Sequence, residues 1–214
     1  MKIKQFIVGI VLAFSCIAIS ASAQKTYTEG TATYGLATPI GNLDAKLIFN
    51  ADSNAFITQQ GPANVKAVSN TAGTYGVILV DVSLIDLKKA AVLTPAELKQ
   101  AEEQAPKYTF TTTTETKLIN GFNSKKVVAK DAKSGSTIEI WVTNDIKAPA
   151  NTLTKLFKEA GGYPVQFKTT QSGQTFDATL KSIVQEKVPA GSFGIPAGYD
   201  RITLKELNTL GGGR

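Results

Sequence analysis

Two carboxylates are placed where a pair of acidic side chains could share one cleft. Glu139 and Asp177 each fall on a predicted strand, on the face opposite its aliphatic residues. A glycosidase needs two carboxyl groups facing one cleft, one of them with a raised pKa. The same placement is typical of solvated strand residues that lie opposite lysines such as Lys130 or Lys181. We prefer this interpretation, because charged residues on strands are usually exposed and paired.

The residues that other common catalytic mechanisms need are missing from the sequence. The chain has no histidine, and its one cysteine, Cys16, lies in the apolar leader described below. Catalytic triads that use histidine, and zinc sites built from imidazole or thiolate, are therefore excluded. The glycines have neither the dinucleotide-binding nor the phosphate-cradling spacing. We expect no enzyme activity and no cofactor.

A short run of oxygen-bearing side chains is a candidate calcium site. Residues Asn50-Ala-Asp52-Ser-Asn54 alternate as calcium ligands do in a loop. A calcium loop also needs a distal glutamate, which this run lacks. Asn, Asp and Ser favour turns by bonding to nearby backbone. We therefore interpret the run as a turn and expect no metal.

Aromatic residues are the strongest candidates for binding. Trp141, the one tryptophan, alternates with Ile138, Ile140 and Val142 on a predicted strand and so faces away from them. If the sheet curves, one face is filled core and the other lines a cavity for a hydrophobic small molecule or a lipid acyl chain. Filling the space between sheet and helix is the alternative role of such rings. The candidate ligand-binding residues are Phe110, Trp141, Phe157, Phe167 and Phe176.

Four lysines cluster along one predicted hairpin: Lys125, Lys126, Lys130 and Lys133. An acidic surface or an anionic lipid headgroup would fit such a cluster. Charged side chains also keep sheet edges from pairing with other sheets, and we prefer this interpretation. No basic cluster is interleaved with stacking aromatic residues, so nucleic acid is not an expected partner.

Hairpins must position these residues. Alternation of apolar and polar residues predicts strands joined by tight turns at Asn120-Gly121, Lys133-Ser134-Gly135 and Ser172-Gly173. A run of hairpins predicts an antiparallel sheet, and a sheet of about ten strands tends to curl or close. The fold class is therefore mainly β: a curved antiparallel sheet, open or half-barrel, with two short helices.

The first helix is predicted by its start. Thr94-Pro95-Ala96-Glu97 combines an N-cap threonine, a proline at the first helical position and a glutamate three residues after the cap. This helix should end near Gln104, because Pro106 follows. The second helix should begin after Asn151 as its cap. Its apolar stripe comprises Leu153, Leu156, Phe157 and Ala160.

The last part of the chain is expected to be less regular. Residues 188–199 are rich in proline and glycine, and Phe193, Ile195 and Tyr199 are expected to hold them to the sheet. A short strand is predicted over Arg201–Leu204. We expect one β-rich domain over residues 24–207, followed by a disordered tail over residues 208–214.

The first 23 residues have the layout of a signal peptide. Lys2 and Lys4 precede an apolar run, and Ala21-Ser22-Ala23 is a small-residue cleavage site before Gln24. The run is shorter than the ~20 residues of a membrane-spanning helix. Cleavage would remove the two lysines and lower the formal net charge from +6 to +4. We expect an exported protein, periplasmic or secreted, that does not span the membrane.

Cys16 allows a different interpretation of the leader, as the lipid-modified cysteine of a bacterial lipoprotein. Lipoprotein signals carry small residues before that cysteine, whereas Phe14 lies two positions before Cys16. Cys16 also lies inside the apolar run instead of at its end. Simple cleavage is therefore our prediction.

The second half carries a pattern found in known exported domains. Its parts are Ile119-Asn120-Gly121-Phe122, Lys125-Lys126-Val127-Val128, Glu139-Ile140-Trp141-Val142-Thr143, Gly162-Tyr163-Pro164, Val188-Pro189 and Phe193-Gly194-Ile195-Pro196-Ala197-Gly198-Tyr199. Over residues 107–200 the chain resembles the DUF4412 and GLPGLI-type exported bacterial domains, which are distantly similar to the lipoprotein-carrier (LolA-like) fold. The resemblance implies an open, strongly curved antiparallel sheet with short helices over its concave side. It brings no catalytic residues.

Two functions are favoured by the sequence over a third, a carboxylate-dependent hydrolase that would use Glu139 or Asp177. The first is an exported, non-enzymatic envelope protein that binds a hydrophobic small molecule or lipid acyl chain in the concave face of a curved sheet. The alternative is a structural or interaction module of the cell envelope, with a packed core and a protein partner on one sheet edge. The interior separates them: a pocket-sized void favours binding, and solid packing favours the module.

Overall fold

Most of the chain forms one large sheet. The computed structural model describes residues 24–38, 41–171 and 174–211. Twelve strands follow the order β14-β7-β6-β5-β4-β3-β2-β13-β12-β10-β9-β8. They are β2 Gly30–Thr38, β3 Gly41–Phe49, β4 Ser53–Gln60, β5 Ala63–Asn70, β6 Gly76–Val82, β7 Leu87–Val92, β8 Tyr108–Ile119, β9 Phe122–Asp131, β10 Thr137–Thr143, β12 Tyr163–Gln171, β13 Gln174–Gln185 and β14 Asp200–Ile202. The predicted leader (residues 1–23), the Ser172-Gly173 turn and residues 212–214 lie outside the described residues.

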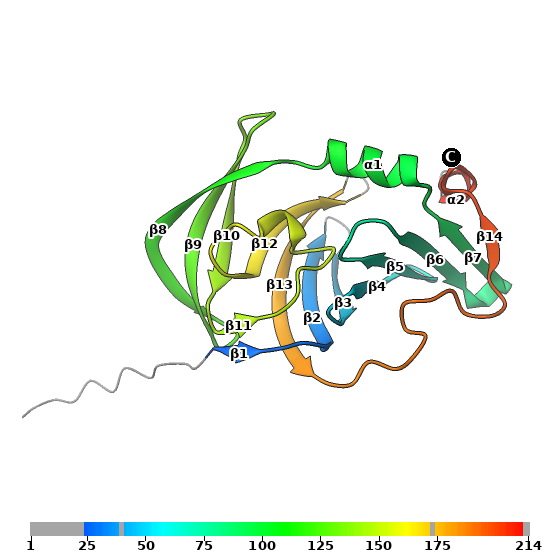
Figure 1. Cartoon of the computed structure of the whole chain (residues 1–214), viewed down its shortest axis with the longest axis horizontal. Coiled ribbons are helices and arrows are strands. Elements are labelled where there is room, and N and C mark those ends of the chain that lie inside the picture. The colour runs from blue at the N-terminus through cyan, green and yellow to red at the C-terminus, as the bar shows by residue number, and fades with distance from the viewer. Residues whose placement is uncertain (1–23, 39–40, 172–173, 212–214) are drawn as a thin grey trace, which may run out of the picture.

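The remaining elements are short. A separate parallel pair joins β1 (Lys25–Thr26) to β11 (Ile146–Lys147). The α-helices are α1 (Pro95–Gln104) and α2 (Leu204–Gly211), and the 3₁₀ helices are η1 (Ser83–Ile85) and η2 (Lys155–Phe157). Figure 1 shows α1 running across one rim of the sheet, from β7 on one side to β8 on the other. No helix among the described residues is long and apolar enough to cross a membrane.

The predicted fold class is confirmed. Neighbouring strands in the large sheet are antiparallel except at β14, which runs parallel to β7. The register shifts in three places: between Thr112 and Thr116, between Trp141 and Val142, and between Leu180 and Ser182. Such bulges bend a strand and increase its twist. They help the half of the sheet from β8 to β2 to curl around its own interior, as Figure 1 shows.

Two predictions from local sequence signals, the turn at Asn120-Gly121 and the start of α1, are confirmed. Asn120 and Gly121 both have positive φ, +48° and +87°, as the tight turn between β8 and β9 requires. The side chain of Thr94 accepts a hydrogen bond from the N–H of Glu97 (3.2 Å), and the Glu97 carboxylate accepts one from the N–H of Thr94 (2.7 Å). This reciprocal cap begins α1 where the sequence predicted it.

The helix predicted after Asn151 is wrong in type and length. Only Lys155–Phe157 forms helix there, as the single 3₁₀ turn η2. The second α-helix is instead α2, which was not predicted and whose last turn includes residues 208–211 of the expected disordered tail. Thr203 caps α2 by the same threonine–glutamate pairing that begins α1, with Glu206 as its partner. That signal was present in the sequence.

Two apolar clusters lie on opposite faces of the sheet. Ala55 and Phe56 are neighbours on β4 and therefore point to opposite faces. Phe56 belongs to the larger cluster, inside the curled half, and Ala55 to the smaller one. Phe193, Ile195 and Tyr199 pack against the smaller cluster, so the predicted role of residues 188–199 is confirmed. Both faces of the sheet are thus covered in part, and the larger cluster surrounds the candidate site.

Candidate functional site

The interior of the curled half is filled by a segment that we call the plug, residues 148–162. Figure 1 shows the segment between β11 and β12, which includes η2, on the concave side of the curved half of the sheet. Phe157 on η2 is 1% exposed and lies between the rings of Phe167 on β12 (5.0 Å between centroids) and Tyr108 on β8 (5.8 Å). The plug therefore occupies the space that an apolar ligand would need.

Ring contacts continue on both sides of Phe157. Tyr34 on β2 meets Phe167 edge-on at 6.2 Å, and Phe110 lies 6.2 Å from Tyr108. Such tilted and edge-on pairs at 4.5–7 Å are the favourable geometry for aromatic rings. We call the set formed by Tyr34, Tyr108, Phe110, Phe157 and Phe167 the aromatic layer. It is a chain of touching rings from β2 to β8.

Hydrogen bonds fold the plug. The side-chain oxygen of Asn151 accepts from the N–H groups of Leu153 (3.0 Å) and Thr154 (3.1 Å), and all three residues are buried. The amide nitrogen of Asn151 donates to the hydroxyl of Tyr163 (3.4 Å). Asn151 was predicted to cap a helix, and its side chain does cap this turn. The cap explains how a polar segment can lie inside an apolar cluster.

A second set of hydrogen bonds ties the plug to the sheet. Asn54 on β4 accepts through its side-chain oxygen from both the N–H (3.1 Å) and the hydroxyl (2.6 Å) of Thr152. Ser69 on β5 bonds to the same hydroxyl (3.2 Å) and to the amide of Asn54 (3.3 Å). Asn54 is 3% exposed. These bonds join segments that are about a hundred residues apart in the chain, and no local sequence pattern indicated them.

Two buried tyrosines complete the interior. The hydroxyls of Tyr34 and Tyr163 lie 3.0 Å apart. Burial, and then the neighbouring Tyr163, raises the pKa of Tyr34 well above its ordinary value. Burial also raises the pKa of Tyr163, although its hydrogen bonds to Tyr34 and Asn151 oppose the shift. Both hydroxyls therefore stay neutral, and the interior holds polar groups without charge.

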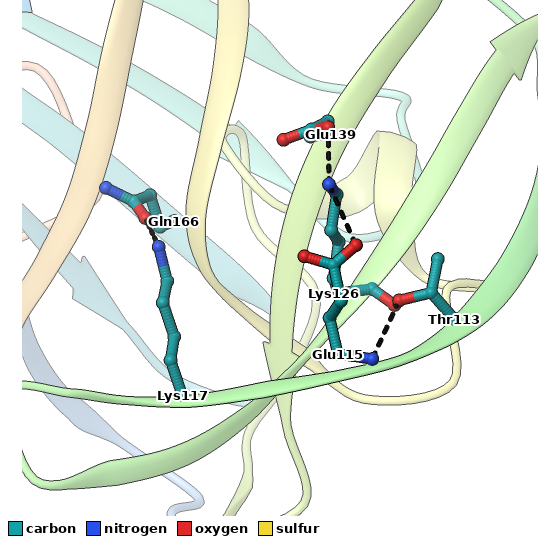
Figure 2. Close-up of polar contacts among 6 residues, drawn as sticks. All are labelled: Thr113, Glu115, Lys117, Lys126, Glu139 and Gln166. Carbon is teal, nitrogen blue, oxygen red and sulfur yellow. Dashed lines mark hydrogen bonds and ion pairs between the residues drawn. The ribbon is translucent and has the colours of Figure 1, made fainter.

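The opposite face of the same strands carries charge. Lys126 on β9 bonds to Glu139 on β10 (2.6 Å) and to Glu115 on β8 (3.2 Å), as Figure 2 shows. Thr113 donates to the carbonyl of Lys126 (3.1 Å) and accepts from the N–H of Glu115 (3.2 Å). Hydrogen bonds to Glu139 and then to Glu115 raise the pKa of Lys126. Lys126 is therefore a fixed cation between two carboxylates.

Trp141 belongs to this outer face. Its cross-strand neighbours are Lys126 on β9 and Gln166 on β12. The ammonium of Lys117, from β8, lies 4.0 Å from the centre of the indole ring and donates to Gln166 (2.7 Å). Figure 2 shows Lys117 reaching toward Gln166 beside the Lys126 cluster. We call Glu115, Lys117, Lys126, Glu139, Trp141 and Gln166 the outer-face cluster.

The five candidate ligand-binding residues thus divide between the two faces. Phe110, Phe157, Phe167 and Phe176 all pack in or against the larger cluster. Trp141 faces away from Ile140, as predicted, but that face is the outer one and not a hollow. The indole is half-buried and packs against the larger cluster, but the strand register separates it from Phe167, and a binding role for the five residues stays a prediction. The lone indole is covered by Lys117, which comes from β8, two strands away in the sheet.

The predicted carboxylates have separate partners. Glu139 pairs with Lys126, and Asp177 on β13 lies 3.8 Å from Lys168 on β12. Their side chains are 63% and 57% exposed. Each therefore lies in an exposed ion pair with a lysine, as preferred from the sequence, although the lysines are not Lys130 and Lys181.

The run from Asn50 to Asn54 is a turn, as preferred. The side chain of Asn50 accepts from the N–H groups of Asp52 (3.0 Å) and Ser53 (2.7 Å). Its last member, Asn54, is buried against the plug. No group of acidic, histidine or cysteine side chains that could hold a metal is found among the residues that the structure describes.

The predicted lysine cluster does not form one site. Lys125 and Lys126 are neighbours on β9 and so point to opposite faces. Lys133 donates to the carbonyl of Glu103 at the end of α1 (2.6 Å). Lys130 forms no ion pair within the described part of the chain. It remains available beside the sheet edge.

The aromatic layer does not contribute to the walls of two surface hollows in the described part of the chain. One, of about 250 Å³, lies beside β11 and the plug, where Lys147, Lys158 and Tyr163 contribute to its wall. The other, of about 550 Å³, is an open groove between α1 and α2. Neither is the apolar interior cavity predicted from the aromatic residues.

Comparisons with known proteins give distant likenesses. No family model matches the chain, and no curated protein matches it. Among solved structures, PNGF-II in a C2 space group is 16% identical over 85% of this chain and 32% of its own, with a TM-score of 0.48. PNGF-II in a P21 space group is 15% identical over 86% of this chain and 33% of its own, with a TM-score of 0.48. MucB in complex with MucA(peri) is 10% identical over 83% of this chain and 56% of its own, with a TM-score of 0.43.

The chain therefore spans about a third of PNGF-II and little more than half of MucB. At these identities and scores, the likenesses carry no function from those proteins to this one. Membership of the DUF4412 or GLPGLI-type domains stays a prediction.

Proposed function

We propose that the protein is a non-enzymatic interaction module of the cell envelope, with a packed interior and a protein partner. The observation that carries this proposal is the contact of Phe157 with Phe167 and Tyr108, at the place where an acyl chain would lie. A ligand could enter only if the plug left. Leaving would break the bonds of Asn54 to Thr152 and of Asn151 to Tyr163, and it would expose the ring of Phe157.

The cost of such an opening supports the module over the lipid-binding alternative. Exposing a buried phenylalanine side chain costs about 1.5–3 kcal/mol. Each buried hydrogen-bonding group left without a partner costs a further ~1–3 kcal/mol. An apolar ligand would have to recover all of this before it gained net affinity. Export, predicted from residues 1–23, would place the module in the periplasm or outside the cell.

In-cell cross-linking tests the proposal. A tagged chain is expressed in its own cells and treated with a short lysine-reactive cross-linker, then purified under denaturing conditions. We expect one dominant protein adduct. The proposal fails if the only adducts are spread over many abundant proteins, while saturable uptake of a fluorescent fatty acid is found.

A further inference from the structure

The two ends of the large sheet are built differently. β14 at one end has three residues, is parallel to β7, and is followed at once by α2. β8 at the other end has twelve residues and pairs only with β9 within the described residues. Figure 1 shows β8 as the outermost strand on its side, with no strand beyond it. A long edge strand offers unpaired backbone groups to another chain.

The direction of those groups follows from two hydrogen bonds. Ala132 donates its N–H to the carbonyl of Lys107, whereas Asp131 donates its N–H to Ser136, on the side of β10. Backbone groups alternate along an antiparallel strand, so Thr109 and Thr111 bond to β9. Tyr108, Phe110 and Thr112 consequently direct their N–H and C=O groups away from the sheet.

Only the first half of β8 is regular. After Thr112 the register slips, and pairing with β9 resumes at Thr116. A bulge of this kind protects an edge from further pairing. The available stretch is therefore Tyr108–Thr112, which we call the β8 edge.

Side chains along the β8 edge indicate what could pair there. Tyr108 and Phe110 face the interior and are half-buried, so they would flank apolar residues of an added strand. Thr109 and Thr111 are exposed on the outer face, and Lys130 lies opposite Thr109 on β9. The region from Lys107 to Lys133 holds six lysines and two acidic residues, a net charge of +4.

This charge favours one occupant over another. A second copy of the chain would bring two regions of net charge +4 together, and this repulsion opposes pairing of the two edges. A segment with acidic residues on its outer face would meet Lys130, which has no ion pair among the described residues. Opposite charge also speeds the encounter of the two chains.

We propose that the β8 edge takes up an extended acidic segment of a partner protein as an added strand, with apolar residues facing Tyr108 and Phe110 and acidic residues facing outward. Main-chain hydrogen bonds would provide affinity, and the alternating side chains would provide selectivity. The inference rests on the proposed function, because it names the surface by which the module meets its partner.

A synthetic peptide tests the proposal: Thr-Val-Glu-Val-Glu-Val-Thr with a fluorescent label, followed by anisotropy and by amide hydrogen exchange. We expect binding below about 1 mM, the weak end of specific affinity. We also expect slower exchange at Tyr108, Phe110 and Thr112, and no change at Thr109 and Thr111, whose amides already bond to β9. A peptide with lysine in place of glutamate should bind at least about tenfold more weakly.

Thr112→Pro is the decisive variant. It removes an outward N–H and leaves the ladder to β9 in place, which proline tolerates on an edge strand. We expect at least about a tenfold loss of peptide affinity, while Thr112→Val binds as the parent does. If Thr112→Pro fails to fold, a peptide N-methylated at alternate amides replaces it and should not bind the parent protein.

Three results would overturn the proposal: no binding of the acidic peptide, equal binding by Thr112→Pro, or a dimer in sedimentation that Thr112→Pro abolishes. The last would assign the edge to a second copy of the chain. Each of these leaves the packed interior, and hence the proposed function, untouched. Saturable uptake of a fatty acid would instead overturn the proposed function whatever the peptide does.

Discussion

Adjacent positions on β9, β10 and β12 point to opposite faces of the sheet, and the two faces differ in character. On the inner face, Val127, Ile140 and Phe167 lie across from each other on β9, β10 and β12, and all are within 1% of full burial. One position further along, Lys126, Trp141 and Gln166 form the corresponding row on the outer face. Because side chains alternate along a strand, the inner row became core and the outer row became a polar surface with one indole.

This difference bears on how function is assigned. Aromatic residues occur on both faces of these strands, yet the inner rings contact each other and the plug, and the indole of Trp141 on the outer face lies under a lysine. Aromatic content therefore does not identify a ligand site in this fold. A ligand site requires a void on the concave side of the sheet, and in this protein the plug occupies that space.

Truncating Phe157 should break the inner face most severely. Phe157→Ala removes the ring that joins Phe167 to Tyr108, and we expect a loss of about 3–5 kcal/mol in the free energy of unfolding, measured by urea titration. Trp141→Ala serves as the matched control on the outer face and should cost clearly less, because the indole is only half-buried. Equal losses would contradict the distinction between the two faces.

Removing the cap of the plug should have the next largest effect. Asn151→Ala leaves the buried N–H of Leu153 without an acceptor, whereas the N–H of Thr154 keeps the backbone carbonyl of residue 151 (3.1 Å), and we expect a loss of about 1–3 kcal/mol. Asn123→Ala is the control: this residue is exposed on β9, and its change should stay within about 0.5 kcal/mol. If the two variants unfold at the same urea concentration, the plug is not held as described.

Alkaline pH tests the buried tyrosines. Their pKa values are raised in the folded state, so ionisation above about pH 10 favours the unfolded chain. Stability should be constant below that pH and fall above it, by up to about 1.4 kcal/mol per pH unit for each tyrosine. Urea titrations between pH 9 and 11, on the order of the tyrosine pKa, would measure the slope.

The variant carrying Tyr34→Phe and Tyr163→Phe together should lose part of this slope, and Tyr34→Phe alone should fall in between. An unchanged slope in the double variant would mean that these hydroxyls are not the groups that alkali titrates.

The smallest effect is expected on the outer face. Lys117→Met removes the cation above Trp141, and we expect a loss of about 0.5–1 kcal/mol. Trp141 is the only tryptophan, so its fluorescence reports on this site alone. Acrylamide should quench it more strongly in Lys117→Met than in the parent. Unchanged quenching would show that Lys117 does not cover the ring in solution.

Sequence patterns predicted the fold class because they act locally. The Thr94–Glu97 cap, the Asn120-Gly121 turn and the alternation around Ile140 each depend on a few adjacent residues. The same reasoning placed Trp141 opposite the aliphatic row. It also marked the stripe of Leu153, Phe157 and Ala160, all of which are buried.

What the sequence did not predict depends on distant residues. The burial of Asn54 requires Thr152, and the cover over Trp141 comes from Lys117 on another strand. The curvature of the sheet determines which face is concave, and the plug fills the space on that face. The helix after Asn151 shortened because Asn151 turns inward to Tyr163 and η2 packs between sheet walls, where tertiary contacts override helical spacing.

Native mass spectrometry of the protein purified from its own cells tests the central claim most directly. If the interior is packed, the spectrum shows the bare polypeptide, and a fluorescent fatty acid added to the sample gives no saturable uptake. A stoichiometric apolar adduct, or saturable uptake that is lost when Phe167 is replaced by a polar residue, would contradict it. The interior would then be a binding site that the plug opens and closes.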